Sequence, residues 1–235
     1  DISLTTKIKN TIFLLNVREW NIDMYLYKVL WNPFKWIGNN FKFLDKKISL
    51  IIVCMFYFIG FSNLFINDFI PKSIVLFLDV FYAVLAFIFI VKAFTERNNA
   101  IRAWLYIISS QLLIALAISM NEHIDFIHIA MYLSGILVAA FVGLFCLIKI
   151  RSIDNDISLN YFHGYAHERK GLAALFLLSC LALLGFPFTP TFIGIDLLFT
   201  YIHTHETILI ISIALGFILI EIAVLRIYAR IFLGQ

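Results

Sequence analysis

Charged residues are scarce in this sequence of 235 residues: they make up 14% of it, against 62% hydrophobic residues. A soluble globular domain carries about 25% charged residues. A soluble fold of this size also has too little interior to bury so much apolar surface. These values exclude a soluble domain, a disordered chain and a coiled coil, and the net charge of +3 is too small to indicate a nucleic-acid-binding protein. We therefore expect an integral membrane protein that contacts lipids.

Patterns typical of cofactor, metal or catalytic sites are also absent. Cys54, Cys146 and Cys180 lie inside apolar runs, at spacings that suit neither a disulfide framework nor a metal site. His163 and His167 lie four residues apart, but no third ligand is evident. The sequence contains no phosphate-binding loop, no dinucleotide-binding glycine pattern and no nucleophile–base pair. We expect no bound cofactor or metal and no redox or catalytic centre in the chain itself, so any enzymatic role is that of a subunit.

Residues 1–47 have no stretch long enough to span a membrane and no signal-peptide hydrophobic region. Aromatic and basic residues alternate there, among them Trp31, Lys35, Trp36 and Lys42. Such residues favour the lipid headgroup layer. We predict an amphipathic N-terminal segment on the membrane surface over residues 1–47, followed by a transmembrane domain over residues 48–235. Because the chain starts at Asp1, we expect a processed protein or a segment of a longer one.

Six apolar runs follow this segment. They cover residues 48–67, 73–91, 103–120, 126–148, 171–186 and 207–225. A helix needs about 20 residues to cross the hydrocarbon layer, and backbone amides in lipid must be paired within their own segment. The runs predict an all-α integral membrane fold of about six spans. The fourth run carries small residues along one face (Gly135, Ala139, Ala140, Gly143), which predicts close packing against another helix.

Basic residues gather in alternate loops. Lys and Arg precede the first run and follow the second and fourth, which places these loops on the inside, either cytoplasm or matrix. Gly185, Pro187 and Pro190 then predict a broken helix, because prolines remove backbone donors and disfavour helical neighbours. Residues 191–201 beyond this break either re-enter the membrane or cross it. Re-entry places Arg226 and Arg230 on the inside, whereas a crossing places them outside.

Ionisable residues inside the apolar runs are the candidates for a proton or ion path. They are Asp79, Asp196 and Glu221, with His128 near the start of the fourth run. A carboxylate at mid-bilayer costs about 2.5–3.5 kcal/mol and usually faces a bundle interior or water, where desolvation raises its pKa. We therefore expect Asp196 to point into the bundle. The alternative is that these acids lie near helix ends and reach headgroups, and that His128 is an interfacial side chain.

Three motifs resemble those of proton-conducting antiporter-like membrane proteins, the large membrane subunits of respiratory complex I and of multisubunit cation/proton antiporters. Residues 102–112 match the pattern R-x-x-x-Y-S-x-x-S-Q-L at Arg102, Tyr106, Ser110 and Gln111. Residues 184–196 resemble the L-x-G-x-P … G-F-x-x-K-D stretch, and residues 225–234 resemble the end of the last helix of the family. Together the motifs cover about residues 75–234, which corresponds to the second half of a family member. Residues 21–47 are also similar to the amphipathic segment of the largest such complex I subunit.

The sequence departs from the family at its intramembrane lysines. The resemblance implies that one of these lysines falls on Ile195 and another near Val138 or Ala139. Asp196, the acid next to the first position, remains. The resemblance therefore supports fold and location better than proton pumping.

The resemblance implies a membrane-arm subunit of a proton-translocating respiratory complex, such as NADH:ubiquinone oxidoreductase, in an inner mitochondrial or bacterial plasma membrane. In that role the chain either conducts protons or is a reduced module that serves as a scaffold. The alternative is the membrane subunit of a cation/proton antiporter or of a bicarbonate-uptake complex. In each case the expected partners are other membrane subunits.

Overall fold

The structure is a computed structural model that describes residues 9, 13, 16, 24, 25, 28, 29, 32–45, 47–65, 71–120, 125–202 and 207–234. Within these residues the regular elements are all helical, as predicted. In chain order they are α3 (Asn32–Asn40), the 3-10 helix η3 (Phe41–Asp45), α4 (Lys47–Phe65), α5 (Lys72–Thr95), α6 (Ala100–Ser119), α7 (Phe126–Asp154), α8 (Tyr165–Glu168), α9 (Lys170–Leu183), α10 (Pro190–Phe199) and α11 (Thr207–Phe232).

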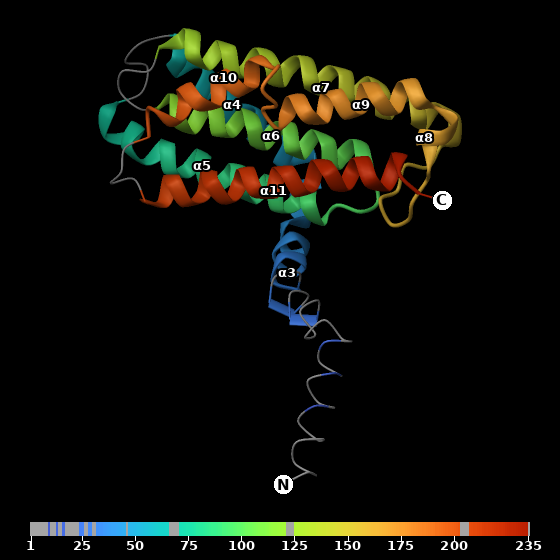
Figure 1. Cartoon of the computed structure of the whole chain (residues 1–235). Coiled ribbons are helices and arrows are strands. Elements are labelled where there is room, and N and C mark those ends of the chain that lie inside the picture. Colours follow the sequence, from blue (N-terminus) through green and yellow to red (C-terminus); the bar gives the residue numbers. More distant parts are fainter. Residues whose placement is uncertain are drawn as a thin grey trace.

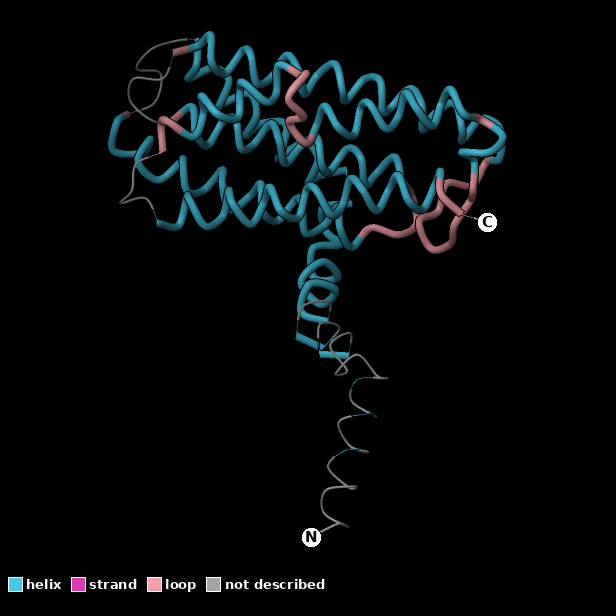
Figure 2. The backbone as a smooth tube through the Cα atoms, viewed as in Figure 1, coloured by secondary structure: helices cyan, strands magenta, loops and turns pink. Residues whose placement is uncertain are grey.

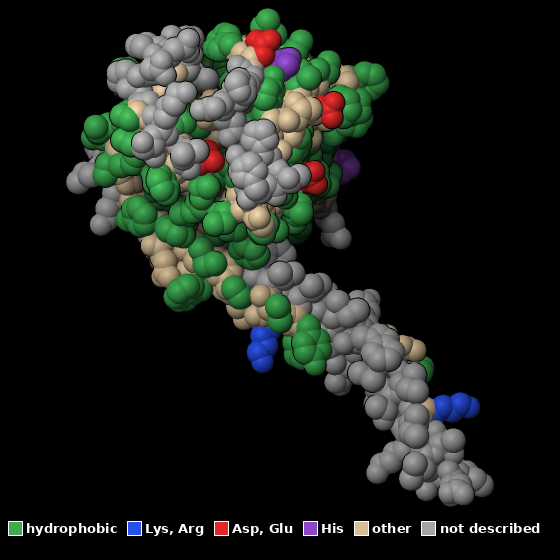
Figure 3. Space-filling view, turned by 90° about the vertical axis from the view of Figure 1, so that its left-hand side faces the viewer, with side chains coloured by type: hydrophobic (Ala, Val, Ile, Leu, Met, Phe, Trp, Pro, Cys, Tyr) green, Lys and Arg blue, Asp and Glu red, His purple; other side chains and the backbone are tan. Residues whose placement is uncertain are grey.

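Four helical segments among the described residues are long and apolar enough to cross a membrane: Phe77–Thr95 of α5, and the helices α6, α7 and α11. They run side by side along one direction in Figure 1. Large hydrophobic side chains remain exposed on their outer faces, such as Phe77 at 77% and Phe141 at 71%, and Figure 3 shows such side chains over much of one end of the bundle. This surface is that of a multi-pass membrane protein, whose apolar exterior faces lipid.

The short helices α9 and α10 lie end to end along α7 (Figure 1). At 14 and 10 residues, each is shorter than the roughly 20 residues that a crossing helix needs. The sequence did not predict that the two would lie in line along one longer helix. The chain then returns through α11, and Arg226 reaches the carbonyl of Glu96 at 2.9 Å. Arg226 and Arg230 thus lie at the same end as the basic loops, as the positive-inside rule favours.

The break between α9 and α10 lies where the sequence places it and is drawn as a pink loop in Figure 2. Gly185 adopts a left-handed conformation with φ of +69°, which glycine reaches without steric cost. The amide of Phe186 donates to the carbonyl of Leu181 at 3.0 Å, and the amide of Gly185 donates to that of Ala182 at 3.3 Å. These two bonds form a Schellman C-cap. Pro190 then occupies the first turn of α10, where its missing N–H leaves no helical bond unmade.

The small-residue face of α7 packs inside the chain, as predicted. A Cβ atom on Gly135 would lie 2.1 Å from Oγ1 of Thr191 in α10, and one on Gly143 would lie 2.1 Å from Cζ2 of Trp104 in α6. The indole N–H of Trp104 donates to the carbonyl of Ala140 at 3.2 Å. The absence of side-chain volume lets the backbones approach closely enough for this bond.

The segment that precedes the bundle packs its end against α5. A Cβ on Gly38 of α3 would lie 2.1 Å from Oγ1 of Thr95, so α3 meets the last turn of α5. The axis of α3 runs across those of the long helices in Figure 1, and Trp36 on α3 is 68% exposed. Trp31 lies outside the described residues, and placement at headgroup depth stays a prediction.

Gly194 supplies a test of this packing. Its Cβ position lies 2.5 Å from Cα of Tyr132, whereas nothing lies within 4 Å of the Cβ position of Gly171. Because backbone atoms block the first site, Gly194→Ala is expected to destabilise the bundle by about 1–3 kcal/mol. Gly171→Ala in α9 should be neutral or stabilising, since alanine favours helix. The thermal unfolding midpoint in detergent measures both, and equal midpoints for the two variants would contradict the α7–α10 contact.

Candidate functional site

A cluster of charged side chains joins η3 to the ends of α5 and α6. Lys92 of α5 contacts Asp45 of η3 at 2.8 Å and Glu96, one turn further along α5, at 3.8 Å. Arg102 of α6 lies 3.9 Å from both Asp45 and Glu96. The hydroxyl of Tyr106 donates to the second oxygen of Asp45 at 2.7 Å. We call these five residues the Asp45 cluster.

Two members of the Asp45 cluster, Lys92 and Glu96, are buried, whereas Arg102 is exposed. The side chains of Lys92 and Glu96 are each only 6% exposed, and that of Asp45 is 26% exposed. Burial alone would raise the pKa of Asp45, but hydrogen bonds from Lys92 and Tyr106 and the charges of Lys92 and Arg102 outweigh it. The pKa of Asp45 is therefore lowered, and the carboxylate stays ionised between its cations.

Arg226 of α11 closes the same end of the bundle. Its guanidinium donates to the carbonyls of Ala93 at 3.1 Å and Glu96 at 2.9 Å, and also to that of Phe94. These carbonyls belong to the last turn of α5 and to Glu96, the residue that caps it, where helical acceptors lack backbone donors. A cation there also suits the negative end of the helix dipole. Arg226 thereby ties α11 to the helix end that carries the Asp45 cluster.

A second polar network lies inside the bundle at the helix break. The amide nitrogen of Gln111 in α6 donates to the carbonyl of Leu183, the last residue of α9, at 3.3 Å. The hydroxyl of Tyr132 in α7 donates to the amide oxygen of Gln111. Gln111 and Tyr132 are both fully buried. The last carbonyls of a helix lack backbone donors, and Gln111 supplies a side-chain donor for one of them at the break.

The four α6 residues that carry the family resemblance all make contacts between helices. Arg102 and Tyr106 belong to the Asp45 cluster, and Gln111 donates to the carbonyl of Leu183 at the helix break. The hydroxyl of Ser110 donates to the carbonyl of Ala86 in α5 at 2.9 Å. The structure therefore assigns these residues to the architecture of the bundle.

Of the three intramembrane acids, only Asp79 is buried, with 6% exposure, and it accepts the amide of Val80 at 2.6 Å. Asp196 and Glu221 are exposed. The expected inward orientation of Asp196 is therefore wrong for this chain. Its inner neighbours on α10, Thr191 and Gly194, occupy the face against α7, and Asp196 points away from it.

Asp196 and Glu221 lie on neighbouring helices. The rings of Phe199 in α10 and Phe217 in α11 are 5.7 Å apart. The two helices are antiparallel (Figure 1). Asp196 is one turn before Phe199 and Glu221 one turn after Phe217, so both acids lie to the same side of the ring contact, and both are exposed. Hydrogen bonds or ion pairs of either carboxylate are not found among the described residues.

His128 lies at the opposite end of the bundle from the Asp45 cluster. Its Nδ1 lies 2.7 Å from the hydroxyl of Tyr201, which also accepts the amide of Asp125 at 3.4 Å. These contacts tie the start of α7 to the residues after α10. A contact between His128 and Asp79, Asp196 or Glu221 is not seen in the described part of the chain, and His203 and His205 lie outside it.

Groups of three potential metal ligands do not occur among the described residues. Nε2 of His163 lies 2.8 Å from the carbonyl of Ser158. The positions at which the family resemblance places lysines are apolar. Val138 is 65% exposed, Ala139 is buried, and Ile195 lies over the break, near Gly185.

Comparison with protein-family models found no matching family, and comparison with curated proteins found no similar sequence. The resemblance to antiporter-like subunits therefore depends on the motif residues alone. Sequence reasoning found Arg102 and Tyr106 through those motifs and missed the partners Asp45, Lys92 and Glu96. The i,i+4 spacing of Lys92 and Glu96 at a helix end was the available signal.

The lowered pKa of Asp45 predicts a pH dependence of stability. A carboxyl group whose pKa is lowered by folding stabilises the fold above its ordinary value of 3.8, and this contribution is lost as pH falls through the folded value. Asp45→Asn should reduce the free energy of unfolding at pH 7 by about 1–2 kcal/mol. It should also flatten the decline below pH 4 in a series of thermal unfolding midpoints. The variant Glu168→Gln, at an exposed position in α8, should keep the wild-type profile, and an unchanged profile in Asp45→Asn would contradict the assigned role.

The network at the break predicts non-additive substitutions. Gln111→Ala leaves the Tyr132 hydroxyl and the Leu183 carbonyl unpaired and should cost about 1–3 kcal/mol of unfolding free energy. Once Gln111 is gone, Tyr132→Phe should cost little more, so the double variant should be less than additive by about 0.5–3 kcal/mol. Unfolding in mixed micelles measures the cycle. Ser134→Ala on the exposed side of α7 is the control, and strict additivity of the first pair would rule out the network.

Proposed function

We propose that this chain is a membrane subunit of a proton-translocating respiratory complex of the complex I type, in which it serves as a scaffold module. Its partners are other membrane subunits. Its membrane is an energy-transducing one, either the inner mitochondrial or the bacterial plasma membrane. The chain contributes helices and contacts to the assembly, and the redox chemistry belongs to other subunits.

The observation that carries the proposal is the exposure of Asp196 and Glu221 on α10 and α11. Their helices are apolar on the same outer faces: Phe192 is 46% exposed and Ile218 is 54% exposed. Lipid chains do not solvate a carboxylate, so an unpartnered charge in contact with them costs several kcal/mol of free energy. Two such acids on one flank favour a neighbouring subunit that covers them and supplies the missing partners.

The type of complex is supported by the motif helix α6 and the broken helix that follows it. Arg102, Tyr106, Ser110 and Gln111 match the family pattern in register, and each has a contact to another helix. The Gly185–Pro190 break occurs at the stretch that resembles the family's L-x-G-x-P motif. The residues that match the family motif also join the helices. This gives the proposed type of complex stronger support than a sequence match alone.

The scaffold role is supported by what replaces the family's lysines. Ile195 and the residues around Val138 offer no ionisable group, and Asp79 lies inside the bundle while Asp196 and Glu221 lie outside it. A proton path needs groups or waters within hydrogen-bond reach of one another. Hydrogen bonds or ion pairs that would join Asp196 and Glu221 into a path are not found among the described residues.

The test is to isolate the native assembly and measure its subunits, its NADH oxidation and its proton flux in vesicles. We expect the chain in a large complex with a redox partner. Asp196→Asn together with Glu221→Gln should lower the fraction of the chain found in the complex by about tenfold, equivalent to about 1.4 kcal/mol. Flux per assembled complex should not change. The control Glu168→Gln, in an exposed loop-side helix, should assemble normally.

Other outcomes separate the alternatives. A complex without a redox partner that exchanges cations for protons, or that takes up bicarbonate, would replace the respiratory assignment. Loss of flux with assembly intact in Asp196→Asn would replace the scaffold role with conduction. A chain that remains monomeric in the native membrane would contradict the subunit proposal.

A further inference from the structure

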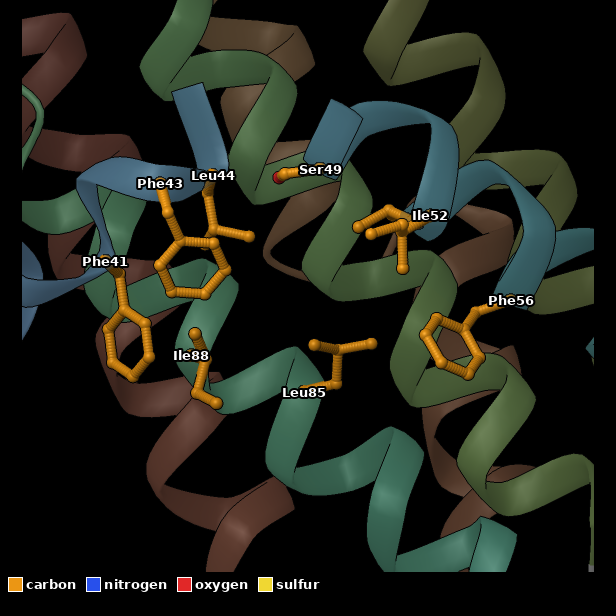
Figure 4. A pocket seen from close by; sticks show the side chains of 9 residues that line it. Phe41, Phe43, Leu44, Ser49, Ile52, Phe56, Leu85 and Ile88 are labelled. Atoms are coloured by element: carbon orange, nitrogen blue, oxygen red, sulfur yellow. The ribbon is translucent and has the colours of Figure 1, made fainter. Parts of the chain in front are cut away.

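An apolar cavity of about 370 Å³ lies where η3 meets α4 and α5 (Figure 4). Its lining includes Phe41 and Leu44 of η3, Phe56 of α4, and Leu85 and Ile88 of α5. This volume is within the range of small-molecule sites, which run from about 300 to 1,000 Å³. The cavity lies between the N-terminal segment and the bundle, apart from the exposed acids of α10 and α11.

Ser49 is the single polar residue in this lining. Ser49 as a whole is 9% exposed, and its hydroxyl oxygen is buried with no hydrogen-bond partner among the described residues. Leaving a buried hydroxyl unpaired costs about 1–3 kcal/mol. An oxygen-bearing ligand in the cavity would supply the partner.

The cavity has a polar end and an apolar end. Leu44 directly precedes Asp45, and Ile88 lies one turn before Lys92, so the Asp45 cluster adjoins the lining at this end. Along α4 the lining runs from Ser49 to Phe56, a distance of about 10 Å at 1.5 Å per residue, toward the apolar middle of the helix. An occupant with a charged head and an apolar tail fits this polarity.

The Asp45 cluster balances two basic with two acidic side chains, but one of its cations, Arg102, is open to a further ligand. Arg102 is 47% exposed, and its contacts to Asp45 and Glu96 are ion pairs at 3.9 Å, so guanidinium donors remain for a further acceptor. Arginine presents its N–H donors in a fixed planar fork, which suits bidentate binding of a phosphate group.

We propose that the cavity binds one acyl chain of an anionic membrane phospholipid. The acyl chain lies between Leu44, Phe56 and Leu85. One of the lipid's ester oxygens accepts a hydrogen bond from Ser49, and its phosphate lies beside Arg102. A helix of a partner protein, about 10 Å wide, would need a larger groove. This inference depends on the multi-pass membrane fold and is independent of the type of complex.

The experiment measures lipid binding to the purified chain in detergent. The probe is dioleoyl phosphatidylglycerol, with dioleoyl phosphatidylcholine and decylubiquinone as the comparison ligands. The readouts are native mass spectrometry of retained lipid and the shift of the unfolding midpoint with added lipid. We expect phosphatidylglycerol to be retained and to raise the midpoint, and decylubiquinone to do neither.

Two variants and one control locate the site. Leu85→Trp fills the cavity and should abolish the phosphatidylglycerol shift. Val84→Trp adds the same bulk to an exposed neighbour outside the lining and should keep it. Ser49→Ala removes the unpaired hydroxyl, so the lipid-free protein should be no less stable, while the dissociation constant for phosphatidylglycerol should rise about three- to tenfold.

Retention of the full shift in both Leu85→Trp and Ser49→Ala would overturn the proposal. If Leu85→Trp fails to fold, the dissociation constant of Ser49→Ala decides alone. Arg102→Gln should bring the affinity for phosphatidylglycerol down to that for phosphatidylcholine. Equal affinities of the wild-type protein for both lipids, or a preference for decylubiquinone, would also overturn it.

Discussion

A polar group buried among membrane helices must find its partner inside the protein, and this constraint organises the bundle around α6. Arg102, Tyr106 and Ser110 lie four residues apart and therefore share one face of the helix, with Gln111 beside them. Through this face α6 reaches Asp45 of the N-terminal segment, a carbonyl of α5 and the carbonyl at the end of α9. These side-chain contacts join α6 to η3, α5, α7 and α9. Lipid offers no water to compete for these groups, so each contact favours the pairing of the elements that it joins.

Glycine makes the same contacts possible by removing side-chain volume. The indole of Trp104 bonds a backbone carbonyl of α7 because Gly143 leaves room for its ring, and Tyr132 reaches Gln111 while Gly194 of α10 lies against its backbone. Close approach and hydrogen bonding are therefore coupled here. A larger residue at either glycine would separate the helices and leave a polar group without its partner, which adds the cost of an unmade bond to that of the clash.

The helical class, the break at Gly185–Pro190 and the packed face of α7 could be predicted from the sequence because each follows from local chemistry: apolar length, missing amide donors and small side chains. The orientation of Asp196 could not. A helix that is apolar on all sides has no amphipathic pattern to mark its inner face, and the expectation that a charge turns inward assumed that the chain supplies its own partners. The Asp45 cluster was missed for a related reason: it joins residues 47 to 61 positions apart, and local patterns carry no information on such pairs. The end-to-end placement of α9 and α10 depends on how both pack on α7, which is likewise a tertiary property.

Some parts of the outer surface can contact lipid directly and others cannot. This difference limits where a partner subunit can bind. The exposed face of α7 around Val138, Phe141 and Phe145 carries no charge and can meet lipid chains directly. The flank of α10 and α11 carries two carboxylates that lipid cannot solvate. Under the proposed function, a partner subunit therefore binds at α10 and α11, because binding at the α7 face would leave Asp196 and Glu221 in contact with lipid. The cavity beside α4 lies on neither surface, so a lipid could remain there while the complex assembles.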